Sequence, residues 1–471
     1  MHSDQGSTAL LAQWAAQFSL ESAPDTVVQR MKALVLDYFR VVAVGARLPW
    51  SRAARTMMLG LGGQGTSTVL LYGDRLDAAR AAFVNGAFAH GCDIDDTHVG
   101  SMHHAGASIL PAVFAVAEKL DADGKRLLEA AIIGYEASLR IGLAVSPTLF
   151  HRGFMPTPTC GAFGAALAVG RLMGFNAQDL AGTLGAASSY AGGLAQFYKS
   201  GSIIKRINGG RAAESGVLAA TLVQHGIWGP RDILEGEAGF FRAFSDSHDP
   251  TQVSRGLGQD FRLMEVSTKA HAGAGRLQAS ADAGLRLASE HHLQPADIVD
   301  VEVGIPQVIQ ARLTQALPPD LQSAQMSVPF GLAISLAIGR TRGAAAGLRP
   351  DDFEAGLASE EIRALAQRVR CVLDPDIEKA TTTEEVPSRV TVRLRNGAEY
   401  TARVDHPRGS PARQMSWDEL SALFTDAIGD ALPQGQPARL SGLIADLDGQ
   451  ARPREIIAGF IADPKWLEET K

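Results

Sequence analysis

The stretch LLEAAIIGYEASLRIGLAV, residues 127–145, indicates the fold class of this chain. Its apolar residues recur three and four positions apart, which is the spacing of one face of an α-helix. The same spacing, with many Gly and Ala residues, occurs in CGAFGAALAVGRLMG (160–174) and GGRAAESGVLAATLVQHG (209–226). Small residues let helix backbones approach closely, so we expect buried, tightly packed helices. From residue 7 to about residue 265 the pattern predicts an all-α core.

The spacing changes after about residue 266. DIVDVEVGI (297–305) alternates polar and apolar residues, as a half-buried strand does. SRVTVRLRNGAEYTARVDHP (388–407) consists of two alternating runs around the pair Asn396-Gly397, the strongest short-range signal of a hairpin. These residues predict a small α/β domain.

Helical spacing returns in SWDELSALFTDAIGDAL (416–432) and REIIAGFIADPKWLEET (454–470). We therefore expect a mainly α protein in which both ends of the chain build one domain. The expected organisation is a large all-α helical domain at 1–266 and 408–471, with a smaller α/β lid domain inserted at 267–407.

The composition is that of a folded globular protein, with 471 residues of which 46% are hydrophobic and 20% are charged. A net charge of −7 gives the chain no electrostatic reason to bind nucleic acid, which needs a basic face. The three cysteines lie far apart and form no CxxC pair. This pattern excludes a cysteine-rich zinc site and favours a reducing compartment.

The N-terminal segment MHSDQGSTALLAQWAAQFSL predicts an amphipathic helix, because it lacks the basic start and continuous apolar run of a signal peptide. Apolar runs such as VPFGLAISLAIG (328–339) are much shorter than the roughly 20 residues that a membrane-spanning helix needs. The helical stretch at 127–145 carries the charged residues Glu136 and Arg140. We therefore expect a cytoplasmic protein with no membrane partner.

The segment GLGGQG, residues 60–65, satisfies the GxGxxG pattern of dinucleotide-binding loops. That fingerprint requires a strand before it and a helix after it. Here the helix-like RAARTMML (52–59) precedes it and the strand-like STVLLYG (67–73) follows it. Because the order is reversed, the segment predicts an ordinary turn.

The segment GCDIDDTHVGSMHHAG, residues 91–106, is rich in groups that can bind metals or carry protons. Its polar side chains are those of Asp93, Asp95, Asp96, Thr97, His98, His103 and His104.

Three interpretations of this segment are open. Asp and His are good metal ligands, yet no HExxH or HxH pairing occurs, and Val99 stands where a DDxxD arrangement needs an acid. The residues can also cap and solvate the preceding helix. If that helix continues through Thr97, Asp93, Asp96 and Thr97 share one face, which suits acid/base chemistry. From the residues alone the structural, acid/base and metal interpretations all stay open.

A second polar segment is YKSGSIIKRINGGRAAESG, residues 198–216. It places Lys199, Lys205, Arg206 and Arg211 beside a predicted helix N-terminus, which itself favours anions. A small polycarboxylate would suit this charge. Taken alone, the segment is better explained as an ordinary basic loop.

A third segment is EVSTKAHAGAGRLQASADA, residues 265–283, in which Lys269 and His271 fall at the inferred domain junction. Ligands often bind in clefts between domains. A lone lysine in a linker is usually solvated, so this segment is weak evidence by itself.

The three segments occur together, in this order and spacing, in one known family. The sequence resembles the MmgE/PrpD family, which includes 2-methylcitrate dehydratase, cis-aconitate decarboxylase and iminodisuccinate epimerase. The resemblance covers nearly the whole chain. The motifs that carry it are AAFVNGAFAHGCDIDDT (81–97), ILPAVFAVAE (109–118), GYEASLRIG (134–142), GAFGAALAVGRLMG (161–174), IIKRINGGRAAESGVLAA (203–220), AQMSVPFGLAISL (324–336) and HPRGSPARQMSWDEL (406–420). It implies a helical domain built from both termini, an α/β lid, a homodimer, and no metal or organic cofactor.

The resemblance also implies which residues form the site. Asp93 and Thr97 match the acid and hydroxyl of the family's D-x-D-D-T segment, and Lys205 and Lys269 match two of its lysines. His104 matches the histidine before the family's P-[GS] pair, although Ala105 replaces the proline. An extra residue in THVGSMHHAG makes His103 an alternative, and we choose His104 because ILPA downstream anchors the register. The expected catalytic residues are His104, Asp93 and Lys269, and the expected substrate-binding residues are Thr97, Lys205, His103, His271, Met155 and Phe330.

The chain departs from the family pattern at four polar positions. Met155 replaces a histidine in the family's G-F-H-P-T-G segment, and Phe330 replaces a tyrosine. Asn208 and Gln278 stand where histidines are usual. Dehydration needs an acid to protonate the departing hydroxyl, and Met155 and Phe330 cannot supply it.

Proton removal beside a carboxylate creates negative charge that fixed cations must neutralise, and Lys205 and Lys269 can do so. We expect His104, held by Asp93, to be the base. The expected function is a cofactor-independent lyase acting on a small carboxylic acid, similar to 2-methylcitrate dehydratase or cis-aconitate decarboxylase, with a lid that closes over the site.

Two alternatives remain open. One is an epimerase or isomerase of the iminodisuccinate type, because the base and cations are retained while acids for a leaving group are missing. The other is a non-catalytic carboxylate-binding homologue, because of the same missing groups.

Overall fold

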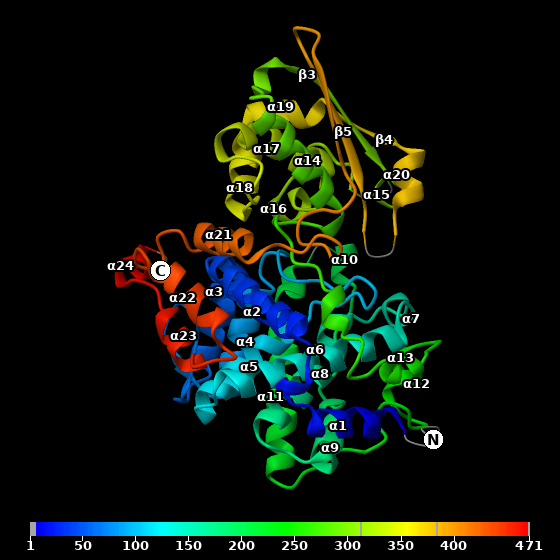
Figure 1. Ribbon diagram of the computed structural model, residues 1–471, viewed down its shortest axis with the longest axis vertical. Helices are drawn as coiled ribbons and strands as arrows, with labels where there is room; N and C mark the ends of the chain where they lie inside the picture. The colour runs from blue at the N-terminus through cyan, green and yellow to red at the C-terminus, as the bar shows by residue number, and fades with distance from the viewer. Residues whose placement is uncertain (1–5, 201, 311–312, 383–384, 470–471) are drawn as a thin grey trace. The chain divides into compact units, whose positions relative to one another are not determined.

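The computed structural model describes residues 6–200, 202–310, 313–382 and 385–469 (Figure 1). Helices far outweigh the two small sheets, so the predicted mainly α fold is confirmed. The chain separates into two compact units. The first consists of Met1–Gly91, Asp95–Val266 and Leu420–Lys471, and the second of Cys92–Ile94 and Ser267–Glu419. The second unit extends past the expected end at 407, and the sequence did not assign Cys92–Ile94 to it.

Helices form most of the first unit. They are α1 (Ser7–Gln17), α2 (Asp25–Gly45), α3 (Pro49–Gly60), α4 (Ala78–Ala89), α5 (Gly106–Leu120), α6 (Gly124–Val145), α7 (Thr148–His151), α8 (Pro156–Leu172), α9 (Ala177–Ala187), α10 (Phe197–Ser200), α11 (Asn208–Gln224), α12 (Phe240–Phe244), α13 (Thr251–Ser254), α22 (Gln436–Ala445), α23 (Pro453–Gly459) and α24 (Pro464–Glu469). The 3-10 turns are η1 (Leu20–Ser22), η2 (Ile203–Ile207) and η3 (Arg262–Glu265). Helix α21 (Trp417–Ile428) begins at the end of the second unit's range, and the short strands β1 (Ser67–Thr68) and β2 (Arg75–Leu76) pair antiparallel.

The three stretches predicted as buried helices form the centre of the first unit. They are α6, α8 and α11, and α8 packs against both of the others. At the α6–α8 crossing, a Cβ added to Gly164 would lie 2.5 Å from the carbonyl oxygen of Gly134. No larger residue fits there, so the prediction that small residues permit close packing is confirmed.

The helix before the acidic segment is α4, and it is well defined at both ends. The Asp77 side chain accepts hydrogen bonds from the backbone N–H groups of Ala79 and Arg80, which starts the helix. The helix ends at Ala89 with His90 as its C-cap. The suggestion that it continues through Thr97 is therefore wrong, and Asp93, Asp96 and Thr97 do not share a helix face.

The charged residues within α6 are paired inside the core. Glu136 and Arg140 lie one turn apart, are almost fully buried, and form an ion pair of 2.9 Å. Arg140 also donates to the carbonyl oxygen of Arg255 at 2.7 Å. Among the described helices, none has both the length and the apolar character that crossing a bilayer requires.

The segment GLGGQG joins a helix to a strand, as predicted. Helix α3 ends at Gly60, and β1 begins at Ser67. Gly62 and Gly63 have φ angles of +75° and +89°, which favour glycine. The segment is a turn between a helix and a strand, and the order that a dinucleotide fingerprint needs is absent here.

The second unit is an α/β domain. Its helices and turns are η4 (Gly275–Leu277), α14 (Gln278–Glu290), η5 (Pro295–Asp297), α15 (Gln307–Gln310), α16 (Leu321–Ala324), α17 (Val328–Arg342), α18 (Pro350–Ala358), α19 (Glu360–Gln367) and α20 (Pro375–Ala380). Its strands are β3 (Ile298–Ile305), β4 (Val369–Leu373), β5 (Ser388–Leu394) and β6 (Glu399–Val404). They form one sheet in the order β4-β3-β5-β6, with β3 parallel to β4 and the other neighbours antiparallel.

The strand and hairpin predictions for this unit are confirmed. β3 covers nearly all of the alternating segment at 297–305. β5 and β6 pair in register across the predicted turn, where Gly397 has a φ of +85°. That backbone conformation explains why glycine occupies the turn.

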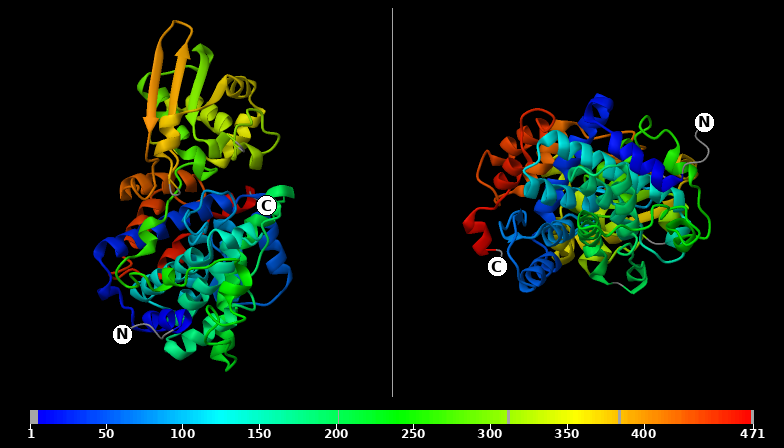
Figure 2. Two further views of the ribbon diagram at one scale, coloured as in Figure 1. Left: turned by 90° about the vertical axis from the view of Figure 1, so that its right-hand side faces the viewer. Right: turned by 90° about the horizontal axis from the view of Figure 1, so that it is seen from below.

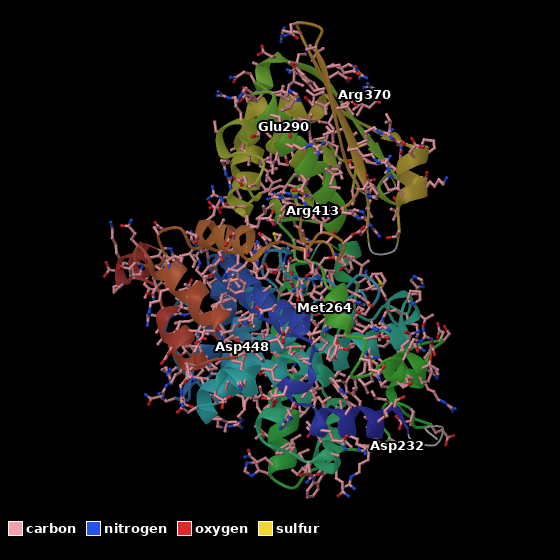
Figure 3. All side chains as sticks on the ribbon, in the orientation of Figure 1. Asp232, Met264, Glu290, Arg370, Arg413 and Asp448 are labelled. Carbon is pink, nitrogen blue, oxygen red and sulfur yellow. The ribbon has the colours of Figure 1, made fainter. Side chains whose placement is uncertain are left out.

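Helices cover one face of this sheet (Figure 2). Helix α14 packs against α17 and against β5 and β6. Charged residues of neighbouring strands pair with one another at the surface of the sheet. Arg370, labelled in Figure 3, forms ion pairs with Asp300 at 2.8 Å and Glu302 at 3.2 Å.

Candidate active site

The acidic segment folds into a loop that brings two histidines to one carboxylate. Oδ2 of Asp95 lies 2.6 Å from Nδ1 of His90 and 3.3 Å from Nδ1 of His104. All three residues are buried. We expected Asp93 to hold His104, and that detail needs correction, because the structure gives this contact to Asp95.

A tight turn positions His104 beside Thr97. The backbones of His98 and His103 exchange two hydrogen bonds of 2.9 and 3.1 Å, and Met102 takes a φ of +53° between them. The turn brings His103 back beside His98. Nδ1 of His104 consequently lies 3.2 Å from the Thr97 hydroxyl and 2.9 Å from the carbonyl oxygen of Asp96.

Three helices, α5, α6 and α8, fix the rest of this loop. The backbone N–H of His104 donates to the Thr157 hydroxyl in the first turn of α8, at 3.3 Å. The Asp96 carboxylate accepts from the backbone N–H of Gly106, where α5 begins, and from the hydroxyl of Tyr135. These bonds leave the His104 ring little freedom, which a positioned acid/base group requires.

Burial sets the charges of this cluster. It lowers the pKa of His90 to about 4, although Asp95 opposes this, so His90 is neutral at physiological pH. Burial would raise the pKa of Asp95, but the neighbouring His104 and His90 outweigh it and hold the pKa well below the usual value. Burial raises the pKa of Asp96 to about 6 despite its two hydrogen bonds. Asp95 is therefore the stable anion of the loop.

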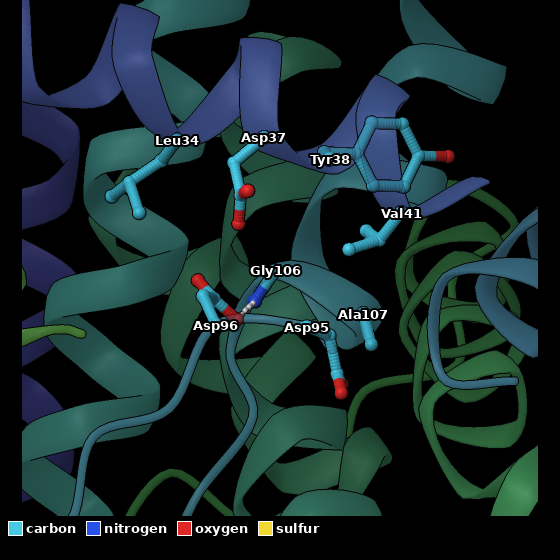
Figure 4. Close-up of a pocket in the computed structure, with 8 residues that line it drawn as sticks. All are labelled: Leu34, Asp37, Tyr38, Val41, Asp95, Asp96, Gly106 and Ala107. Carbon is cyan, nitrogen blue, oxygen red and sulfur yellow. Dashed lines mark hydrogen bonds between the residues drawn. The ribbon is translucent and has the colours of Figure 1, made fainter. Parts of the chain in front are cut away.

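A small cavity of about 10 Å³ lies next to this cluster (Figure 4). It is lined by Leu34, Asp37, Tyr38, Val41, Asp95, Asp96, Gly106 and Ala107. Figure 4 shows the carboxylate of Asp37 pointing toward Asp96 and Gly106, and the Asp95 carboxylate turned away from Asp37. A cavity of this size holds roughly one water molecule, so it is too small for a carboxylic acid substrate.

We expect His90→Asn to make the free energy of unfolding less sensitive to acid between about pH 7.5 and about pH 5. Folded His90 stays neutral down to its pKa of about 4, whereas an unfolded histidine takes up a proton near 6.5. The unfolded state therefore binds more protons in this window, and wild-type stability falls as the pH falls. Between these two pH values, the free energy of unfolding of the variant should fall by about 2 kcal/mol less than that of wild type, as measured by urea unfolding. An identical loss would contradict a neutral His90, and the exposed His225→Asn is the matched control.

The second polar segment brings one of its cations close to this loop. Lys205, on η2, is 9% exposed, and its charge helps to lower the pKa of His90. Its Nζ lies 5.7 Å from the ring centre of Tyr198. The hydroxyl of Tyr198 in turn points to the sulfur of Met155, 4.0 Å away. The first unit thus gathers His104, Thr97 and Lys205, while Met155 is 2% exposed at the start of α8.

The other cations of that segment have different surroundings. Arg206 is buried with its guanidinium 5.8 Å from the ring centre of Trp50. Arg211 pairs with Glu214 on the same helix. The side chain of Lys199 lies outside the described part of the chain. Lys205 is therefore the segment's candidate for substrate binding.

In the second unit, Lys269 is paired with Asp93. Its Nζ donates to the carbonyl oxygen of Asp93 at 2.9 Å and lies 3.4 Å from Oδ1 of the same residue. Asp93 has a φ of +60°, the left-handed conformation that aspartate adopts more readily than most residues with a side chain. Lys269 is 5% exposed, so the carboxylate supplies the counter-charge that a buried ammonium needs.

His271, expected to bind substrate, has both ring nitrogens engaged inside the second unit. Nε2 lies 3.0 Å from the Asp282 carboxylate, and Nδ1 accepts from the backbone N–H of Leu348 at 3.2 Å. The Gln278 amide bonds both the N–H and the carbonyl of His271. These contacts favour a structural role for His271. Phe330, on α17, is fully buried in the same unit.

His103, the alternative to His104, is fully buried. Neither of its ring nitrogens has a hydrogen-bond partner among the described residues. Burial, reinforced by the neighbouring histidines, keeps the pKa of His103 well below its usual value. It is a neutral core residue, which supports the choice of His104.

A metal ion is the other use for three such groups. His90, Asp95 and His104 offer ligand atoms that all lie within 4.8 Å of one another. Two tetrahedral ligands at about 2.0–2.1 Å from zinc lie about 3.3 Å apart, however. The 2.6 Å between Asp95 and His90 is a hydrogen-bond distance instead. Nδ1 of His104 also faces the Asp96 carbonyl, so the geometry fits an acid/base centre better than a metal centre.

The sequence interpretation missed His90 and the role of Asp95. Both lie in the motif AAFVNGAFAHGCDIDDT, so a signal was present. Their partnership depends on where α4 ends and how the loop turns, and the residue order alone does not give that.

Two family models match successive parts of the chain. The MmgE/PrpD N-terminal domain matches residues 9–253, and the MmgE/PrpD C-terminal domain matches residues 271–448. Cis-aconitate decarboxylase of Aspergillus terreus is 27% identical over 466 residues, covering 94% of this chain and 93% of that protein. The human cis-aconitate decarboxylase is 27% identical over 414 residues, covering 85% and 83%. A cis-aconitate decarboxylase-like protein of Aspergillus oryzae is 25% identical over 475 residues, covering 96% of each chain.

The protein is thus an enzyme of the lyase class, as these relatives are. It belongs to the MmgE/PrpD family, because the two family models together span most of the chain.

Proposed function

We propose that this enzyme is a cofactor-independent lyase of a small carboxylic acid, and that cis-aconitate is the first substrate to test. The observation that carries the proposal is the contact between the buried Asp95 anion and His104, with Lys205 close by. A histidine fixed beside an anion can accept and return a proton near neutral pH. The names of the relatives support cis-aconitate as the substrate.

In the proposed decarboxylation, the bond between the substrate carbon and the leaving carboxylate breaks. Its electron pair stays on the carbon skeleton, and CO₂ departs. The imidazolium of His104 then gives its proton to carbon and becomes neutral, and solvent returns the proton. Asp95 stabilises the imidazolium form, because the two opposite charges lie close together in a buried site.

The cations are proposed to bind the remaining carboxylates and to balance the negative charge that develops on the substrate. Lys205 serves this role in the first unit. Lys269, whose ammonium is paired with Asp93, is proposed as the cation of the second unit. The motion of that unit as a lid, with boundaries near 267 and 407, stays a prediction.

Incubating the purified enzyme with cis-aconitate, citrate and 2-methylcitrate tests the proposal. We expect CO₂ release from cis-aconitate and one unsaturated product by ¹H NMR. Heat-denatured enzyme is the control. Failure to convert any of the three acids would count heavily against a lyase of this substrate class.

An epimerase or isomerase is the second candidate, favoured by Met155 and Phe330 standing where proton donors are usual. Proton exchange on carbon does not need an acid for a leaving group. In deuterated water the enzyme would then place deuterium on the substrate carbon without net elimination. Tight binding of a carboxylate with neither exchange nor product would favour a non-catalytic homologue instead. The homodimer and the cytoplasmic location also stay predictions.

A further inference from the structure

A buried pair behind His104 is not explained by the proposed reaction itself. His90 is fully buried and Asp95 is 1% exposed, and they are joined by the 2.6 Å contact between Nδ1 and Oδ2. The same Oδ2 lies 3.3 Å from Nδ1 of His104. The two imidazole rings lie 5.0 Å apart and are inclined by 64°. One carboxylate oxygen therefore serves both histidines.

The surroundings fix where the proton of His104 resides. Nδ1 faces the Asp96 carbonyl at 2.9 Å and the Asp95 carboxylate at 3.3 Å, and both groups can only accept a hydrogen bond. Nδ1 must carry the proton, so Nε2 carries the lone pair. Nε2 has no hydrogen-bond partner among the described residues. This is the nitrogen that can exchange a proton with a substrate.

His90 faces an acceptor in the same way. Its Nδ1 carries a proton toward Asp95, and its buried Nε2 has no partner among the described residues. The nearby charge of Lys205 disfavours a second proton on His90. His90 is therefore a neutral donor that holds the carboxylate without supplying charge.

We propose that Asp95 and His90 are positioning residues for His104. Asp95 fixes the Nδ1–H tautomer of His104 and balances the charge of its imidazolium form. His90 orients the Asp95 carboxylate. The inference rests on the proposed role of His104 as the proton carrier. The unprotonated trio carries one negative charge on Asp95. When His104 gains a proton, that charge is balanced within the buried cluster, which favours the cationic intermediate.

Other titratable groups also surround His104. Asp96 lies on the same loop, His103 directly precedes His104 in the chain, and Lys205 approaches from η2. None of these would change in the variants below. A shift in His104 titration can therefore be assigned to the altered pair.

Three variants separate the parts of the proposal. Asp95→Asn removes the anion but keeps the size of the side chain. His90→Asn keeps an N–H donor near the position of Nδ1, whereas His90→Leu has the same shape as the Asn variant and no donor. The matched control is Glu265→Gln, because Glu265 lies 3.0 Å from His98 of the same loop and forms a similar histidine–carboxylate pair.

The first readout needs no substrate. In protein labelled with ¹⁵N-histidine, NMR should find neutral His104 with its proton on Nδ1. In Asp95→Asn, the midpoint of its titration should move to lower pH by about one unit. An Nε2–H tautomer, or an unmoved midpoint in Asp95→Asn, would overturn the inference. The signal is assigned with His104→Gln, and Glu265→Gln should leave it in place.

The second readout is CO₂ release from cis-aconitate as a function of pH. We expect kcat to fall about 10- to 1,000-fold in Asp95→Asn and about 10-fold in His90→Leu, with recovery to within about 3-fold of wild type in His90→Asn. The basic limb of the pH profile, where the imidazolium of His104 loses its proton, should move to lower pH in Asp95→Asn. Glu265→Gln should keep both the rate and the profile of wild type.

The outcomes distinguish the two proposals. If His104→Ala is inactive while Asp95→Asn and His90→Leu match wild type, the pair has no positioning role and the proposed function stands. If His104→Ala is as active as wild type, His104 is not the proton carrier and both proposals fall. If wild type leaves cis-aconitate unchanged, the NMR result alone decides on the pair, and the substrate proposal fails separately.

Discussion

His104→Ala should lower kcat by about 10² to 10⁴-fold while leaving the protein folded. The imidazole is the group that gives and takes the proton in the proposed reaction, and alanine offers no replacement. Its ring lies at the end of a loop held by backbone bonds, including the bond from its own N–H to Thr157, so folding does not depend on the ring. Steady-state kinetics with cis-aconitate and circular dichroism measure the two properties.

His103→Ala is the matched control, because it removes the same side chain one residue earlier. His103 is fully buried and its ring nitrogens have no partners in the described part of the chain. Its loss should leave a void and cost about 1–3 kcal/mol of unfolding free energy. At a temperature where both variants are folded, kcat should stay within about 3-fold of wild type. Reversed effects of the two variants would make His103 the proton carrier.

Lys269→Ala should lower kcat/KM by about 10² to 10³-fold, through both a higher KM and a lower kcat. In the proposed mechanism its ammonium compensates charge on the bound carboxylate and on the transition state alike. The pairing with Asp93 keeps a cation at a position that is only 5% exposed. Kinetics with cis-aconitate separate the two constants.

Two variants accompany this measurement. Lys269→Arg keeps the charge and should retain more activity than Lys269→Ala, although its larger head group does not fit the same contacts. Lys379→Ala removes an exposed lysine of α20 in the same unit and should change neither constant. Equal activity of wild type and Lys269→Ala would remove Lys269 from the mechanism and leave the fold unaffected.

The sequence predicted the parts of the site that depend on residue type and family motif. His104, Thr97 and Lys205 lie within one unit, and Lys205 is close enough to influence His90. The sequence did not predict which acidic residue holds the ring of His104. Asp93, Asp95 and Asp96 are near neighbours in the chain, and each carboxylate has a different partner in the structure.

His271 illustrates the same limit in the second unit. A histidine at an expected domain junction resembles a ligand-binding residue in sequence. The structure surrounds it with the Asp282 carboxylate and the N–H of Leu348, which lies far along the chain. Contacts over such separations depend on packing that no local pattern encodes.

Local sequence patterns were enough to predict the helices of the first unit, the strands and hairpin of the second, and the turn at GLGGQG. These features follow from local periodicity and from glycine's access to positive φ, which act over a few neighbouring residues. Two contacts became visible only in the folded chain: Asp95 is shared by His90 and His104, and Asp93 pairs with Lys269. The reason is physical: where a loop side chain points, and which buried charge it meets, is fixed by the packing of elements that are distant in sequence.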